Sequence, residues 1–143
     1  MLIKDLHVEQ SLEIILSHFK NESVYFTIKF NTPIGNIEVN PEKHFSFVFI
    51  DDIKYIKEDI KEGLNKDLPV IKVGCMESLF DISIHKNPEE ENSFTFRIGI
   101  DLRKVLYNKP NFDGPCLTIT VNRKSIEELV KYFEEIIKKY DNK

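Results

Sequence analysis

Three aspartates in or beside apolar segments are the residues whose type and position come nearest to acid–base chemistry. They are Asp81, Asp101 and Asp113. Two poised carboxylates can hydrolyse a glycosidic bond, and one can act as a general acid or base. An aspartate at the end of a strand more often caps a turn or pairs with a neighbouring cation. We therefore keep an enzyme or small-ligand site as an alternative, in a sheet pocket that contains Asp101, Arg97 or Asp81.

The sequence lacks the short motifs that usually bind a metal ion or a cofactor. The four histidines, His7, His18, His44 and His85, form no HxH or HxxxH pair, and none lies beside a cysteine. Zinc sites need three or four N, S or O ligands, usually with one closely spaced pair. The five glycines are scattered, so neither GxGxxG nor a GxxxxGK[ST] phosphate loop occurs. The sequence predicts no metal site, no cofactor and no catalytic residue.

The charge balance disfavours a nucleic-acid partner. The chain has 24 acidic and 20 basic residues, a net charge of −4, and the two signs are interleaved along its length. A polyphosphate partner favours a concentrated basic face. A mildly acidic domain instead suits a basic protein partner, although many acidic proteins are acidic only for solubility.

Two features predict a reduced protein of the cytoplasm. Cys75 and Cys116 lie in apolar stretches outside any CxxC motif, and we expect both to be buried thiols. The sequence shows no secretory signal, and no apolar run approaches the ~20 residues that cross a bilayer. We expect no membrane partner.

Alternating apolar residues predict most of the fold. The chain is 41% hydrophobic, with 11 Phe and no Ala, a composition that favours strands. Period-two alternation predicts strands at about residues 12–17, 24–30, 37–39, 45–50, 70–75, 79–85, 94–102 and 116–121. Polar breaks with Pro, Gly and Asn between them predict turns. No linker or repeat divides the chain, so residues 1–143 are expected to form a single domain.

Helical periodicity appears twice. Ile53, Ile56, Ile60 and Leu64 form one stripe after Asp51 or Asp52, either of which can cap the helix. Near the C-terminus, Ser125 and Glu128 have the spacing of a capping box. The stripe that follows consists of Ile126, Leu129, Val130, Phe133, Ile136, Ile137 and Tyr140. The prediction is an α+β fold: a mostly antiparallel meander of 7 to 9 strands, a mid-chain helix, and a C-terminal amphipathic helix packed on the sheet.

Two loops are the candidate partner-binding segments. Glu89, Glu90 and Glu91 form an acidic tip between two predicted strands. Tyr107, Phe112 and Asp113 lie in or beside a second loop that is rich in Pro and Gly. Exposed aromatic residues often anchor protein interfaces. The simplest interpretation of the acidic tip is a solvated loop, and the functional interpretation makes it part of an acidic docking edge.

The order of elements resembles a family of bacterial proteins. It runs from the apolar segment 45–50 into the helix 51–60, then through strands that include 94–100 to the closing helix from 125. This order is similar to that of small immunity proteins of bacterial toxin–immunity systems, in particular those paired with wall-associated and other polymorphic toxins. The resemblance implies no catalytic residues and tight binding of a cognate toxin, often through an acidic face.

A non-enzymatic binding protein that neutralises a toxin is therefore the leading interpretation. The alternatives are the small-ligand or hydrolytic domain near Asp101 and a structural subunit of a larger assembly. The sequence leaves the oligomeric state open.

Overall fold

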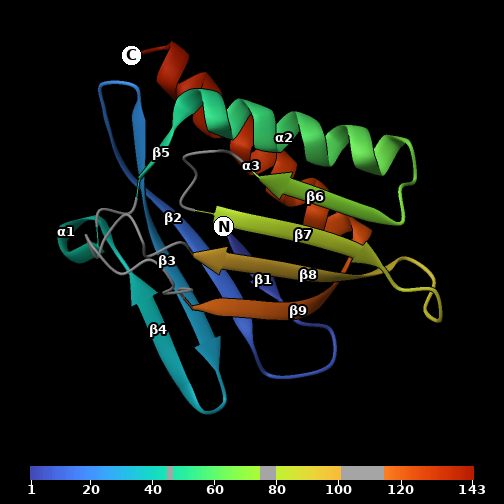
Figure 1. Ribbon diagram of the computed structural model, residues 1–143. Coiled ribbons are helices and arrows are strands. Elements are labelled where there is room, and N and C mark those ends of the chain that lie inside the picture. The colour runs from blue at the N-terminus through green and yellow to red at the C-terminus, as the bar shows by residue number, and fades with distance from the viewer. Residues whose placement is uncertain (45–46, 75–79, 101–114) are drawn as a thin grey trace.

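The computed structural model describes residues 1–44, 47–74, 80–100 and 115–143 (Figure 1). The predicted α+β class is confirmed, and all strand pairs within the described residues are antiparallel. The strands belong to two sheets, whereas the sequence predicted a single meander. Tyr107, Phe112, Asp113, Asp101 and Cys75 lie outside the described residues.

The first sheet contains the N-terminal strands in the order β1-β2-β3-β4, with β5 also paired to β3. Their bounds are Leu2–Lys4 for β1, Ser11–Lys20 for β2, Ser23–Thr32 for β3, Gly35–Val39 for β4 and Phe47–Phe49 for β5. Alternate residues of β3 are buried, as the period of two requires. β1 was not predicted, because three residues are too few to show a period.

The second sheet is a four-stranded meander in the order β6-β7-β8-β9. Its strands are β6 at Val70–Gly74, β7 at Phe80–Lys86, β8 at Ser93–Ile100 and β9 at Cys116–Asn122. β8 has the most regular alternation in the sequence and is an interior strand that pairs with both β7 and β9. Its apolar face carries Phe94, Phe96, Ile98 and Ile100, all buried.

Three helices accompany the sheets: α1 at Pro41–His44, α2 at Ile50–Asn65 and α3 at Arg123–Asp141. α2 and α3 pack against each other on one side of the sheets (Figure 1). Both predicted stripes face inward: Ile53, Ile56, Ile60 and Leu64 of α2 are buried, and so are five of the seven named residues of α3. The other two, Ile137 and Tyr140, are partly buried against the same core.

Both predicted helix caps are wrong, for the same local reason. α3 begins two residues before Ser125, and the side chain of Asn122 accepts a hydrogen bond of 2.9 Å from the Ser125 amide. α2 begins at Ile50 without a side-chain cap, so Asp51 and Asp52 lie in its first turn. There their negative charge still favours the helix N-terminus. In each case the helix starts directly from the end of a strand, which moves its first turn upstream of the expected cap.

A glycine allows α2 to approach the second sheet closely. A Cβ atom at Gly63 would lie 2.5 Å from Cγ1 of Ile71 in β6. Only a residue without a side chain fits at that distance. The core is one continuous cluster that draws residues from both sheets and from both long helices. No helix among the described residues is both long enough and apolar enough to cross a lipid bilayer.

Candidate functional site

The loop between β1 and β2 joins the two sheets through a single carboxylate. Asp5 accepts hydrogen bonds from the amides of His7 at 2.7 Å, Val8 at 3.0 Å and Thr120 at 2.7 Å. The Gln10 side chain donates a fourth, at 3.2 Å. Thr120 belongs to β9, so Asp5 connects the N-terminal loop of the first sheet to the last strand of the second.

The hydrogen bonds also set the protonation state of Asp5. Burial by itself raises the pKa of the carboxyl, but the bonds from His7, Thr120, Gln10 and Val8 favour the ionised form, and the pKa lies below its ordinary value. A carboxylate with a lowered pKa and four donors is a poor proton donor near neutral pH. Its role is therefore to shape the loop.

The same loop covers the outer edge of β9. The Leu6 amide donates to the Thr120 carbonyl at 2.9 Å, and Gln10 Nε2 donates to the Thr118 carbonyl at 3.0 Å. These groups take the place of a further strand. Because the loop is held at both ends, the side chains between Asp5 and Gln10 are presented outward. Leu6 is 44% exposed and Val8 is 54% exposed.

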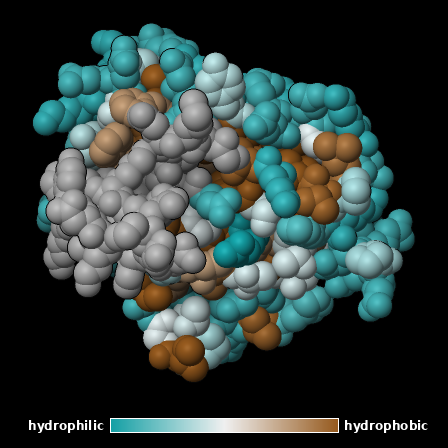
Figure 2. All heavy atoms as spheres, in the orientation of Figure 1, coloured by the Kyte–Doolittle hydropathy of each residue, from teal (hydrophilic) through white to brown (hydrophobic). Residues whose placement is uncertain are grey.

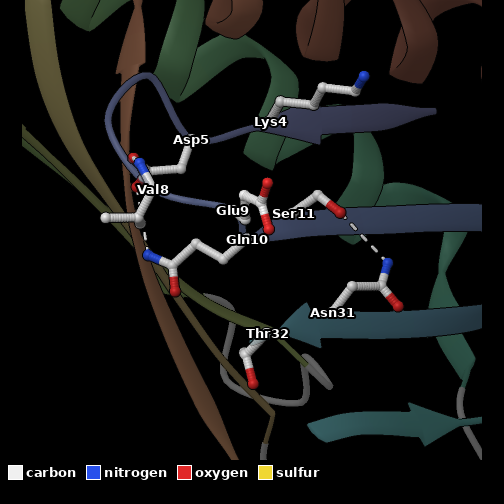
Figure 3. Close-up of a pocket in the computed structure, with 8 residues that line it drawn as sticks. All are labelled: Lys4, Asp5, Val8, Glu9, Gln10, Ser11, Asn31 and Thr32. Atoms are coloured by element: carbon white, nitrogen blue, oxygen red, sulfur yellow. Dashed lines mark hydrogen bonds between the residues drawn. The ribbon is translucent and has the colours of Figure 1, made fainter. Parts of the chain in front are cut away.

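A hollow of about 360 Å³ opens beside this loop. Figure 3 shows Glu9 in the middle of the hollow, between Asp5 and Val8 on one side and the Ser11–Asn31 pair on the other. Asn31 Nδ2 donates to Ser11 Oγ at 3.2 Å. The hollow is lined by Lys4, Asp5, Val8, Glu9, Gln10, Ser11, Asn31 and Thr32. It is shallow and open, and it resembles part of a docking surface more than a reaction chamber.

The acidic tip predicted from the sequence lies next to the β1–β2 loop. Glu90 Oε2 is 3.2 Å from Nε2 of His7, and Glu89 and Glu91 are exposed on the same turn. The turn is held from inside: Asn87 Nδ2 donates to the hydroxyl of buried Ser93 at 2.7 Å, and Thr95 Oγ1 donates to Asn87 Oδ1 at 2.8 Å. We call the group formed by Leu6, His7, Val8, Glu9, Glu89, Glu90 and Glu91 the acidic loop surface.

The described residues give little support to the alternative site near Asp101. Asp81 and Arg97 share the outer, solvent-facing side of the second sheet and are both exposed. Asp101 itself is outside the described residues. No group of three or more His, Cys, Asp or Glu side chains that could hold a metal ion occurs in the part of the chain that the structure describes.

The expectation of a buried Cys116 is wrong. The thiol is exposed, and Arg97 Nε lies 3.0 Å from its Sγ atom. Leu117, Ile119 and Val121 of β9 point into the core, so the alternation places Cys116 on the opposite face. Neighbours in a strand lie on opposite faces, so the apolar residue beside Cys116 did not predict that Cys116 itself is buried.

Sequence reasoning missed the β1–β2 loop altogether. Leu6 and Val8 alternate with charged residues and would have supported a strand. The only signal of their exposure is Asp5, a residue that commonly bonds to the amides of a turn that follows it. The sequence matches no protein family model and no curated protein.

Proposed function

We propose that this chain is a non-enzymatic binding protein of the bacterial cytoplasm, an immunity protein that neutralises a toxin by binding it through the acidic loop surface. The observation that carries the proposal is the exposure of Leu6 and Val8 among four carboxylates, on a loop held rigid by Asp5. A protein interface combines apolar anchors with a polar rim. Holding the loop in place before binding lowers the entropy cost of association.

The charge of the surface defines the partner. Glu9, Glu89, Glu90 and Glu91 carry negative charge, and His7 and the nearby Lys4 are the basic groups beside them. A partner with a basic face and an apolar recess would match this arrangement. Toxins that act on nucleic acids have basic active-site faces, because their substrate is a polyanion. Covering such a face would block the substrate directly.

The first test uses the toxin encoded beside the gene. Isothermal titration should show binding tighter than about 1 µM, and the association rate should fall as salt is raised, because steering by charge is screened. Val8→Asp and the double variant Glu9→Lys/Glu90→Lys should each weaken binding by at least about tenfold, which corresponds to about 1.4 kcal/mol.

The matched controls lie on α2, away from the acidic loop surface (Figure 1). Tyr55→Asp and Glu58→Lys, both at exposed positions of this helix, repeat the two kinds of change there. They should leave binding unchanged. Equal losses in the control variants would reject the acidic loop surface, and no binding to the toxin at 100 µM would reject the immunity role.

A further inference from the structure

Within the described residues, no strand pairs with the outer edge of β4. Of the four terminal strands of the two sheets, β1 and β9 lie against each other and β6 packs against α2. β6 is further protected by Pro69 at its start and Lys72 in its middle, both of which discourage strand addition. β4 pairs with β3 on one side only, in a hairpin that projects from the body of the protein (Figure 1).

An apolar side chain lies on this open edge. Ile37 is 49% exposed, although its partner in β3, Phe30, is 2% exposed. Ile37 therefore extends the core face of the sheet to the edge and leaves half of its own surface in water. Figure 2 shows hydrophobic patches along the lower rim of the molecule, where Figure 1 places this hairpin. An exposed apolar strand edge is a template for pairing with another strand.

The backbone of β4 has groups directed outward. In an antiparallel pair, alternate residues point their N–H and C=O groups toward and away from the neighbouring strand. The pair that closes a two-residue hairpin exchanges hydrogen bonds, and here that pair is Thr32 and Gly35. Counting from it, Ile37 faces Phe30, and Asn36 and Glu38 face the open edge.

We propose that the chain self-associates by antiparallel pairing of β4 with β4 of a second copy, about a twofold axis at Ile37. In this register Ile37 lies opposite Ile37 of the second copy, and Asn36 lies opposite Glu38. The two isoleucines cover each other, and no like charges meet. Shifting the axis by one residue to Glu38 would instead place two carboxylates opposite each other, which destabilises a strand pair.

The pairing joins two first sheets into one continuous sheet and leaves the acidic loop surface free. The β1–β2 loop lies at the opposite edge of the first sheet from β4. A five-residue edge buries less area than a standard interface, so we expect a dissociation constant of about 10–100 µM. The inference is independent of the proposed toxin binding.

Sedimentation velocity of the full chain between about 1 and 500 µM tests the proposal. The wild type should shift from monomer to dimer over this range, and Ile37→Asp should remain monomeric. The circular-dichroism melting curve of the monomer shows whether this variant is folded. Val70→Asp on the covered β6 edge is the matched control and should dimerise as the wild type does.

A pair of substitutions at one position tests the register. Asn36→Lys creates two Lys–Glu38 pairs across the axis and should tighten the dimer about fivefold, whereas Asn36→Asp opposes two carboxylates to Glu38 and should weaken it about as much. Glu38 is already close to Lys29 at 3.7 Å and accepts from Asn40 at 3.0 Å, which keeps both effects modest. A wild type that stays monomeric up to 500 µM would overturn the proposal, and so would shifts of the same sign for Asn36→Lys and Asn36→Asp.

Discussion

The outer edges of β9 and β4 differ: the β1–β2 loop covers the edge of β9, and the edge of β4 is open among the described residues. The outer groups of β9 are met by the Leu6 amide, the Gln10 side chain and the Asp5 carboxylate. The outer edge of β4 meets no partner among the described residues, and Ile37 stays half exposed. A loop of five or six residues is enough to close a strand edge, provided that one side chain can accept several amides at once.

The comparison also distinguishes the side chains that hold the loop in place from those that are exposed for binding. In the loop that closes β9, the side chains of Asp5 and Gln10 are turned inward, whereas Leu6 and Val8 are exposed together with the polar His7 and Glu9. Leu6 and Val8 are exposed because Asp5 and Gln10 occupy the inner positions. Closing one edge thus creates the surface that we propose for the toxin, while the open edge offers a second surface for self-association.

Proline substitutions on the two edge strands should show the largest difference in the free energy of unfolding. Thr120→Pro removes the amide that donates to Asp5 at 2.7 Å, and we expect a loss of about 3 kcal/mol in the free energy of unfolding. Glu38→Pro removes an amide that faces the open edge and should cost about 1 kcal/mol or less. Urea denaturation of the two variants measures both values. Equal losses would show that the β4 edge is closed as well.

Acid should destabilise the contact between the β1–β2 loop and β9, because it protonates Asp5. Because the pKa of Asp5 is lowered in the folded protein, its stabilisation is present above the ordinary pKa of an aspartate, about 3.9, and is lost as the pH falls through the lower folded value. Asp5→Asn should cost about 1–2 kcal/mol at pH 7. The difference from the wild type should shrink as the pH falls below about 4.

Urea denaturation at several pH values follows this difference. Glu9→Gln, on the same loop but exposed, is the matched control and should follow the wild type at every pH. A constant gap between Asp5→Asn and the wild type from pH 7 to pH 3 would contradict the role given to the Asp5 charge.

The smallest effect is expected at the contact between the two loops. His7 and Glu90 are both about half exposed, and surface ion pairs contribute little. His7→Ala should therefore change the free energy of unfolding by about 0.5 kcal/mol or less. A larger loss in thermal or urea denaturation would mean that the β7–β8 turn helps to close the edge of β9.

Most of the fold could be predicted because its signals are local. Phe94, Phe96, Ile98 and Ile100 alternate without a break, and β8 lies where they indicate. The C-terminal stripe likewise predicted a buried helix face. The predicted cap of α3 is wrong because Ser125 competes with Asn122, a residue of similar capping ability that stands at the end of β9. Local spacing alone does not choose between them.

The candidate site was predicted in part. The exposed Glu89, Glu90 and Glu91 were named from their charge and their position between two strands. Their neighbours His7, Val8 and Glu9 are about 80 residues away in the sequence, and no local pattern connects the two segments. Tyr107, Phe112 and Asp113 remain predictions, since they lie outside the described residues.

The sequence by itself determined most of the strands, the two long helices and which of their faces are apolar, because periodicity is a property of neighbouring residues. Only the tertiary structure decided that the strands form two sheets, that Asp5 reaches Thr120, and that β4 remains an open edge. These features depend on contacts between distant segments. Many pairings of the same strands would satisfy the local patterns equally well, and only the packing of one core selects among them.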